Sequence, residues 1–283
     1  MSPIITLTTD FGYHDAYAAA VKGVILSTNP QSNIVDITHS IEPQNIAQGA
    51  FILNVACRHF PKQTIHLAIV DPGVGGERQG IILKTPSYFF VAPDNGILSY
   101  IIDELSPLIS PTTGDMHAPM KVKFKAGLEA VAITDPRFWR HPVSSTFHGR
   151  DIFAPVAAGI SLGISIYEFG EKINSLHVFL PPKPLLDPQD NLIGQVIYID
   201  HFGNLITNIK NSDLPGKDAT VEIAGYNIQG ISNYYAQYDG VLAIPGSSGY
   251  LEISLRNGSA CNFLDIMVED EVRVVSPLYD QEV

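Results

Sequence analysis

The chain of 283 residues contains only two cysteines, Cys57 and Cys261, and a single tryptophan. Two cysteines are too few for a disulfide framework or a cysteine-based metal site, and their apolar neighbours indicate inert buried thiols. No stretch approaches the roughly 18 consecutive apolar residues of a membrane span, so we expect none. The first residues also lack the basic and apolar regions of a signal peptide, and we therefore expect a cytoplasmic protein.

Basic residues are scarce as well. The sequence has 17 Lys and Arg against 29 Asp and Glu, a net charge of −12, and no run of Lys or Arg. Because proteins that bind nucleic-acid backbones usually carry a basic patch, this balance argues against that class. With 45% hydrophobic and only 16% charged residues, the chain is not disordered. A chain of this length can bury a large core without disulfide or metal staples.

Strand-like and helix-like segments alternate in the first two-thirds of the chain. This alternation predicts an α/β domain, with a central, mostly parallel sheet and helices on both faces. The apolar periodicity predicts strands at Ile4–Thr9, Asn33–Thr38, Thr64–Val70, Gly80–Lys84 and Tyr88–Ala92, and helices at Asp15–Ser27, Asn45–Phe60 and Ile152–Ile160. Ser106–Ser145 has weak periodicity, and we expect a long loop or an inserted excursion there.

A proline-rich segment, Leu-Pro-Pro-Lys-Pro at 180–184, has the composition of a semi-rigid linker. Beyond it the pattern changes to short β-rich runs separated by turns, which indicates a small barrel or sandwich. These runs are Gly194–Ile199, Leu205–Ile209, Ala219–Ala224, Gly240–Ile244, Tyr250–Leu255 and Glu271–Val275. We therefore expect an α/β N-terminal domain at 1–183 and a smaller, all-β, barrel-like C-terminal domain at 190–283.

Three polar segments of the N-terminal part are candidates for a site. Asp10 ends the first predicted strand, Asp71 and Arg78 flank a glycine-rich turn after another strand, and His148 precedes a predicted helix. Ligands of open α/β sheets bind beyond the carboxyl ends of strands. The glycine-rich turn is not a P-loop, and Arg78 occupies the third glycine position of a dinucleotide fingerprint. The structural alternatives are an Asx turn at Asp10, a tight turn at Asp71 and a helix cap at Asp151.

Two segments of the C-terminal part add recognition groups. Phe202 and Asn204 lie in a turn, where an aromatic face can stack on a base and an amide can read the edge of that base. Ser247 and Glu252 belong to a second polar segment, and the region around Ala260 follows it. The alternative for each is an ordinary hairpin turn.

Taken in order, six short segments resemble the S-adenosyl-L-methionine (SAM) hydroxide adenosyltransferases, relatives of the bacterial fluorinase and chlorinase. They read Thr-Thr-Asp-Phe-Gly, Val-Asp-Pro-Gly-Val-Gly, Ala-Pro-Asp-Asn-Gly, Thr-Phe-His-Gly-Arg-Asp-Ile-Phe-Ala-Pro, Phe-Gly-Asn and Ser-Ser-Gly-Tyr-Leu-Glu. One motif alone is weak, but six in this order over nearly the whole chain are specific. The resemblance implies an enzyme that replaces methionine at the ribose C5′ with hydroxide, giving adenosine and L-methionine.

The resemblance also implies which residues act. Catalysis falls on Asp71, Arg78 and His148. Substrate contacts fall on Asp10, Asp71, Asn95, Phe202, Asn204, Ser247, Glu252 and Ala260. It further implies a homotrimer whose sites lie between the N-terminal domain of one subunit and the C-terminal domain of its neighbour. SAM is the substrate, and we expect no cofactor, no metal, and no membrane or nucleic-acid partner.

The sequence leaves the role of His148 open between accepting a proton from water and orienting that water. Arg78 does not deprotonate in a protein, so it must act as a hydrogen-bond donor. Three alternatives also stay open for the whole chain. These are a halide-using relative, a non-catalytic adenosine or SAM sensor, and a metal-dependent hydrolase that uses Asp10, His14, Asp15 and His148.

Overall fold

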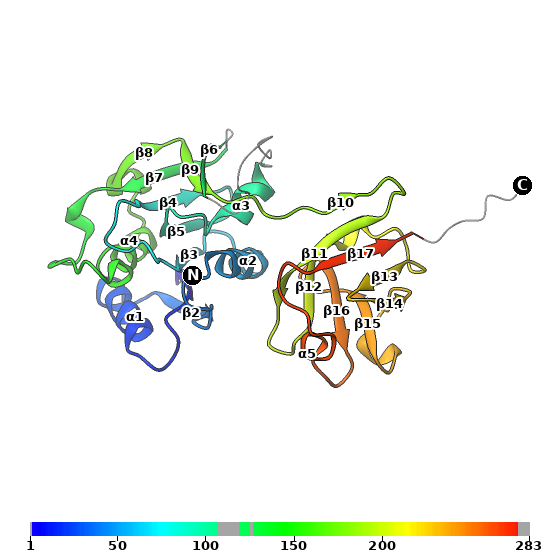
Figure 1. Ribbon diagram of the computed structural model, residues 1–283. Helices are drawn as coiled ribbons and strands as arrows, with labels where there is room; N and C mark the ends of the chain where they lie inside the picture. Colours follow the sequence, from blue (N-terminus) through cyan, green and yellow to red (C-terminus); the bar gives the residue numbers. More distant parts are fainter. Residues whose placement is uncertain (1, 107–118, 125–126, 277–283) are drawn as a thin grey trace, which may run out of the picture. The chain divides into compact units, whose positions relative to one another are not determined.

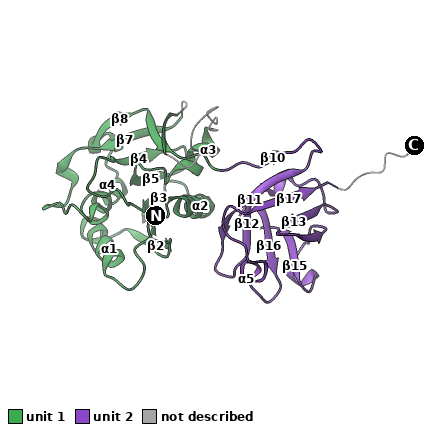
Figure 2. Ribbon diagram, viewed as in Figure 1, with its two compact units in different colours: residues 1–181 green, residues 182–283 purple. Residues whose placement is uncertain are grey.

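The computed structural model describes residues 2–106, 119–124 and 127–276. The chain forms two compact units, residues 1–181 and 182–283 (Figure 2). The predicted boundaries, 183 and 190, lie just beyond this division. Each unit has its own apolar core. None of the helices in the described ranges has the length and apolar character that a membrane crossing requires.

Unit 1 is built around a mixed, seven-stranded sheet with the order β2-β1-β3-β5-β4-β7-β8. The first four strands of this order are parallel, while β4, β7 and β8 join in antiparallel fashion. The prediction of an α/β domain is confirmed, but the parallel part covers only half of the sheet. The strands are β1 (Ile4–Thr9), β2 (Asn33–Thr38), β3 (Ile65–Ile69), β4 (Gly80–Lys84), β5 (Phe89–Pro93), β7 (Glu129–Ile133) and β8 (Gly170–Ile173).

Helices cover both faces of this sheet, as predicted (Figure 1). Helices α1 (Tyr17–Thr28) and α4 (Ala154–Ser161) pack on one face, and α2 (Ile46–Cys57) and α3 (Ser99–Leu105) on the other. The alternation of strand side chains explains the two cores, since Leu67 faces α1 and α4 while Ala68 faces α2 and α3. Helix α2 begins where the side chain of Asn45 accepts a hydrogen bond from the Gln48 N–H.

Of the two alternatives for Ser106–Ser145, a long loop or an inserted excursion, the long loop is wrong for the described part of the segment. Two strands lie there, β6 (Met120–Lys123) and β7, and β6 pairs with β9 (Ser175–Val178) in a separate two-stranded sheet. Strand β7 lies inside the main sheet, between β4 and β8. Its sequence, Glu-Ala-Val-Ala-Ile, is too short and alanine-rich to signal a strand by itself, and its burial between neighbours stabilises it. Residues 107–118 and 125–126 of the predicted loop lie outside the described residues.

Unit 2 is an antiparallel sheet that nearly closes into a barrel, which confirms the second predicted domain type. Its strand order is β14-β13-β17-β11-β12-β16-β15, with β10 paired to β11. A single β-bridge joins Ile231, just after the edge strand β14, to Ala243 on the other edge strand, β15, so the sheet is nearly closed. The elements are β10 (Leu185–Leu186), β11 (Leu192–Ile199), β12 (Leu205–Lys210), β13 (Thr220–Ile223), β14 (Tyr226–Gln229), β15 (Val241–Pro245), β16 (Tyr250–Leu255), β17 (Glu271–Val275) and the short helix α5 (Ala260–Leu264).

Candidate active site

The carboxyl ends of β1 and β3 place two predicted carboxylates at one edge of the unit 1 sheet. These strands are parallel neighbours, and Thr9 is paired with Ile69. Asp10 directly follows Thr9, and Asp71 follows Ile69 by two residues. The fold therefore brings together two acidic residues that are about 60 positions apart in the sequence, at the edge where open α/β sheets bind ligands.

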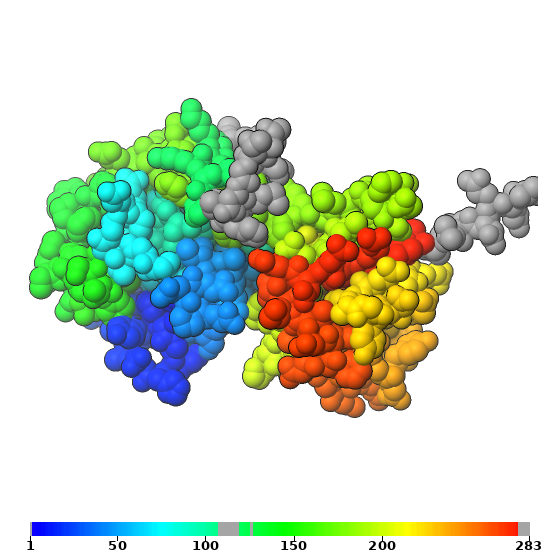
Figure 3. All heavy atoms as spheres, viewed as in Figure 1, coloured from blue at the N-terminus to red at the C-terminus, as the bar shows by residue number. Residues whose placement is uncertain are grey.

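The turn after β3 lies on the surface of unit 1 (Figure 3, cyan). Its last part carries Arg78 back onto Asp71. Arg78 Nε donates to Asp71 Oδ1 at 2.8 Å, and Arg78 Nη2 donates to Asp71 Oδ2. The side chains of Arg78 and Asp71 are only 12% and 6% exposed. The guanidinium also lies over the Phe153 ring, 5.2 Å from its centroid. A two-pronged pair of this kind fixes the plane of the guanidinium.

His148 completes a chain of three side chains. Arg78 Nη2 also lies 2.9 Å from His148 Nδ1. Because a guanidinium can only donate, Nδ1 must accept, and the ring proton of the neutral imidazole therefore resides on Nε2. Burial and then the positive charge of Arg78 lower the pKa of His148 from its ordinary value, which keeps the ring neutral. The structure thus brings together all three residues that the resemblance assigned to catalysis.

Close backbone packing holds His148 against the turn. A Cβ on Gly75 would lie 2.2 Å from the Ser145 carbonyl oxygen, and φ of Gly75 is +78°, so this contact requires glycine. On the other side, a Cβ on Gly149 would lie 3.3 Å from the Phe11 ring. The residues on either side of His148 therefore lie against the loops that follow β3 and β1.

The buried carboxylate of Asp151 also holds the segment around His148 in place, a role that the sequence did not predict. Asp151 is completely buried, within a π-helical turn (Gly149–Phe153) rather than at a helix cap. It pairs with Arg140 and Arg150 and accepts from the Ser144 N–H at 2.9 Å. Burial opposes ionisation, but the hydrogen bonds from Arg150, Ser144 and Arg140 prevail and lower the pKa of Asp151. The sequence showed only an acidic residue before an apolar helix. That pattern is typical of a helix cap, and it does not distinguish a cap from the ion-pair cluster that the structure shows.

Asp10 and Asn95 differ in the polar atoms that they leave open. Asp10 Oδ2 accepts from the Gln44 N–H at 2.9 Å, and the described residues offer Oδ1 no hydrogen bond. Asn95 instead uses both ends of its amide, donating to the Val70 carbonyl at 2.8 Å and accepting from the Ile97 N–H. Asn95 thereby helps to hold Val70, the residue before Asp71, in place. The predicted contact of Asn95 with the substrate stays a prediction.

In unit 2, the turn between β11 and β12 presents Phe202 and Asn204. The Phe202 ring is 73% exposed, whereas Asn204 is buried. Asp200 organises the turn, because its Oδ1 accepts from the Phe202 and Asn204 N–H groups and its Oδ2 from Asn204 Nδ2, each at 2.9 Å. The Gly203 carbonyl accepts from the Cys261 N–H at 2.9 Å, which brings this turn against the start of α5 and the buried Ala260.

Glu252 is a buried carboxylate on β16 with one oxygen still available. Glu252 Oε1 accepts from the Tyr235 and Ser254 hydroxyls, both at 2.7 Å. Burial and then the hydrogen bond to Glu252 raise the pKa of Tyr235 to about 12, so the phenol keeps its proton. Glu252 Oε2 lies beside Gly246, in the turn that also carries the exposed Ser247. The described residues offer Oε2 no hydrogen bond, and it can receive a cationic group.

The residues proposed for a metal-dependent hydrolase do not form a ligand set. His14 and Asp15 are exposed, and His148 Nδ1 is already bonded to Arg78. Within the described ranges, no three His, Cys, Asp or Glu side chains converge as metal ligands would. Cys57 and Cys261 are free thiols, and burial raises the pKa of Cys57 to about 11, which makes it a poor nucleophile.

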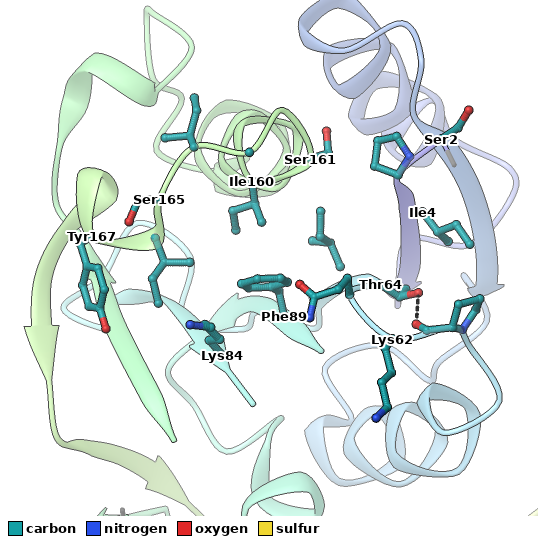
Figure 4. Close-up of a pocket in the computed structure, with 17 residues that line it drawn as sticks. Ser2, Ile4, Lys62, Thr64, Lys84, Phe89, Ile160, Ser161, Ser165 and Tyr167 are labelled. Atoms are coloured by element: carbon teal, nitrogen blue, oxygen red, sulfur yellow. Dashed lines mark hydrogen bonds between the residues drawn. The ribbon is translucent and has the colours of Figure 1, made fainter. Parts of the chain in front are cut away.

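A cavity of about 500 Å³ lies elsewhere in unit 1, at the amino ends of β1 and β3 (Figure 4). Phe89, Ile160 and Tyr167 are among its lining residues. The cationic Lys84 at its wall is paired with Glu129 at 2.8 Å. No residue of the predicted site lines this cavity, so its size alone does not connect it to the chemistry at the opposite edge of the sheet.

Two family models match the chain. The SAM hydroxide adenosyltransferase N-terminal domain matches residues 5–170, and the C-terminal domain of the same family matches residues 194–273. Among solved structures, an uncharacterised conserved protein from Thermotoga maritima is similar, with 32% identity and a TM-score of 0.82 over 96% of this chain and all of that one.

Curated proteins with two different names are also similar to the chain. A protein from Methanocaldococcus jannaschii named (R)-S-adenosyl-L-methionine hydrolase is 33% identical, covering 96% of this chain and 95% of its own length. One of the same name from Thermus thermophilus is 31% identical over 97% of this chain and its entire length. A fluorinase from Nocardia brasiliensis is 28% identical over only 75% of this chain and 73% of its own length.

Proposed function

The chain belongs to the SAM hydroxide adenosyltransferase family, and on that premise we propose that it hydrolyses SAM to adenosine and L-methionine. The observation that carries the proposal is the chain of hydrogen bonds from Asp71 through Arg78 to His148. It gathers a fixed positive charge and a neutral imidazole at the edge of the sheet. Such a group of donors suits the placement of one water molecule.

The reaction needs help for the nucleophile rather than for the leaving group. A water oxygen attacks the ribose C5′ as the C5′–S bond breaks, and the electron pair of that bond stays on sulfur as the methionine thioether. The attacking water loses one proton, so SAM and water give adenosine, methionine and H⁺. Because the sulfonium leaves as a neutral thioether, no general acid is required. Holding the water in line with the C5′–S bond lowers the entropic part of the barrier.

We assign His148 the task of orienting the water. Its Nδ1 accepts from Arg78, so its Nε2–H is the group left to meet the water, and an N–H donates to the water oxygen rather than taking a proton from it. Arg78 supplies positive charge that stabilises hydroxide-like character as the proton departs to solvent. Asp71 holds Arg78 in place through two hydrogen bonds.

Unit 2 supplies groups that match the rest of the substrate. The exposed Phe202 ring offers a stacking face for adenine, and Asn204 offers an amide to its edge. The free oxygen of Glu252 suits the ammonium of the methionine part. Asp10, in unit 1, keeps one oxygen for the ribose hydroxyls. Ser247 and Ala260 remain assigned to substrate contact by the resemblance.

We further propose a homotrimer in which each site combines unit 1 of one subunit with unit 2 of its neighbour. The supporting observation is that the reacting groups and the recognition groups lie on different units. Co-expressing Arg78→Ala chains with Asn204→Ala chains tests this arrangement. Random mixing in a closed ring leaves about one site in four with both halves intact, so activity should recover. Activity no higher than that of the two separate variants would contradict it.

Product analysis tests the proposed reaction directly. We expect the purified protein to convert SAM into adenosine and methionine in the absence of halide, and ¹⁸O from labelled water should appear in the adenosine 5′-hydroxyl. The same assay with each sulfonium epimer assigns the form that the chain uses, since the curated relatives are named for the (R) form. Label in any other position, or no label, would exclude attack by water at C5′.

The same assay separates the two remaining alternatives. The fluorinase similarity makes a halide a reasonable competing nucleophile, and 5′-halo-adenosine formed with chloride or fluoride would identify that activity. Tight SAM binding without any product would identify a sensor instead. We propose that the reaction requires no metal or cofactor, so full activity should persist in EDTA, and a loss that zinc or magnesium restores would contradict this.

A further inference from the structure

Two turns of unit 2 share one hydrogen-bond pattern, and only one of them bears the proposed base-binding groups. Both run Asp-x-x-x-Asn, from Asp187 to Asn191 and from Asp200 to Asn204. In each, the first residue accepts from two backbone N–H groups and from the asparagine side chain. In the first turn these distances are 2.8, 2.9 and 3.0 Å, and in the second all three are 2.9 Å.

The carboxylate of Asp200 determines which end of the Asn204 amide faces away from it. A carboxylate only accepts hydrogen bonds, so the NH₂ group of Asn204 must face Asp200. The carbonyl oxygen, Oδ1, is then directed away from Asp200, and within the described ranges it has no hydrogen-bond partner. The residue as a whole is buried and its amide is held by Asp200, so Oδ1 is left as a fixed acceptor that can receive a donor from a ligand.

The direction of this amide matters for the choice of base. The 6-amino group of adenine is a donor that can bond to the Asn204 carbonyl oxygen. The 6-oxo group of hypoxanthine is an acceptor and would meet that oxygen unfavourably. A freely rotating asparagine could turn its NH₂ group toward a 6-oxo base, since its two ends are nearly the same shape. Pairing with Asp200 prevents that rotation.

We propose that Asp200 is a positioning residue that fixes the Asn204 amide and thereby makes unit 2 select 6-aminopurine over 6-oxopurine nucleosides. This inference rests on the proposed function, because it assumes that Phe202 and Asn204 hold the base. It adds a residue that acts through another, and it names the chemical feature of the base that the site reads.

The test compares the affinities of the full-length protein for adenosine and inosine, measured by calorimetry. The wild-type chain should prefer adenosine by about tenfold to a hundredfold, the range expected when a buried acceptor loses its donor. Asp200→Asn should reduce this preference about tenfold, because a neutral amide no longer dictates the direction of Asn204. The matched control, Asp187→Asn, makes the same change from carboxylate to amide in the first turn and should leave the preference unchanged.

A double-mutant cycle keeps the test decisive if Asp200→Asn also loosens the turn. Asn204→Ala removes the amide, so adding Asp200→Asn to it should not change the adenosine-to-inosine ratio further. An unchanged ratio in Asp200→Asn, or an equal drop in Asp187→Asn, would overturn this inference while leaving hydrolysis of SAM intact. A wild-type chain that neither binds adenosine nor hydrolyses SAM would overturn the proposed function as well.

Discussion

The two units hold their polar side chains for different purposes. In unit 1, Asp71, Arg78 and His148 bind one another, and the donors and acceptors between them are largely satisfied within the group. In unit 2, Asp200 and Tyr235 hold their neighbours so that the Phe202 ring and one oxygen of Glu252 stay available. A closed group with fixed charge suits a reaction, whereas open faces on a rigid frame suit recognition. Substitutions in the Asp71, Arg78 and His148 group should therefore change kcat, and those in the recognition groups of unit 2 should change KM.

The largest effect should come from Arg78 and His148. We expect His148→Ala and Arg78→Ala to lower kcat by about 10²–10⁴-fold, the usual range for losing a group that directs a proton or water in the transition state. The affinity for adenosine should change little, because the base groups lie on unit 2. Adenosine formation and calorimetric binding measure the two quantities separately.

Arg78→Lys is the matched control for this substitution. Lysine retains the positive charge but cannot make the two-pronged bond to Asp71 and also reach His148 Nδ1. Its kcat should therefore fall almost as far as that of Arg78→Ala, while melting temperatures report whether either chain is unfolded. A lysine variant with nearly full activity would mean that charge alone matters, and the geometric argument for unit 1 would be wrong.

A smaller loss of kcat should follow from separating the turn after β3 from the segment before His148. In Gly75→Ala the new methyl group would collide with the Ser145 carbonyl oxygen, so His148 should move away from Arg78. We expect about a tenfold to hundredfold loss of kcat, as for small misplacements of a reacting group. Gly163→Ala is the control, since Gly163 also has positive φ, +85°, but nothing within 4 Å of the added Cβ.

Both glycine variants should lose about 1 kcal/mol of unfolding free energy from backbone strain, because alanine disfavours positive φ. Only Gly75→Ala should also lose turnover. Thermal unfolding and kcat, measured on the same samples, separate strain from displacement. Equal effects of the two variants on kcat would show that this close approach does not position His148.

The corresponding change in unit 2 should act on binding alone. Phe202→Ala removes a ring whose stacking on a base is worth about 1–3 kcal/mol, so KM should rise roughly tenfold to a hundredfold with kcat nearly unchanged. Tyr226→Ala, on β14, removes another exposed aromatic ring and should leave KM unchanged. A loss of kcat in Phe202→Ala would contradict the claim that the recognition groups of unit 2 act on substrate binding alone.

The sequence predicted the local elements well wherever apolar periodicity was strong. Strands β1, β2, β4 and β16 have the predicted bounds, and α2 lies within the predicted helix. Strand β7 was not predicted, because its short, alanine-rich sequence has little β-propensity of its own. The sequence did not predict that β4, β7 and β8 are the antiparallel strands, since strand order depends on contacts between segments that are distant in the sequence.

For the site, the residue types and motifs identified which side chains to examine, but not how they are connected. The bond between Arg78 and His148 joins positions 70 residues apart, and no local pattern predicts it. The anchoring of Asp151 by Arg140 and Ser144 requires the chain to turn back on itself, as does the approach of Gly75 to Ser145. Asp200, by contrast, begins the segment that carries Phe202 and Asn204, and the spacing of an Asx turn was a readable signal there.

The smallest expected effect is that of mild acid on kcat. Burial and the charge of Arg78 lower the pKa of His148 below its ordinary 6.5, so the ring stays neutral at neutral pH and kcat should be constant there. Protonation would place a second donor opposite Arg78, so activity should fall only on the acid side. A histidine of ordinary pKa would lose about tenfold at one pH unit below 6.5, and the lowered pKa should make the loss at pH 5.5 smaller.

Folding must be followed in the same pH range, because burial lowers the pKa of His66 to about 4 and also lowers that of His39. The unfolded chain binds protons on these rings before the folded chain does, so stability falls as pH drops below about 6.5 toward 4. Circular dichroism at each pH identifies the range in which the fold is intact. Within it, kcat should decline with acid while KM stays constant, because the titrating group belongs to unit 1. A KM that rises with acid while kcat holds would assign the pH dependence to unit 2 and remove His148 from the explanation.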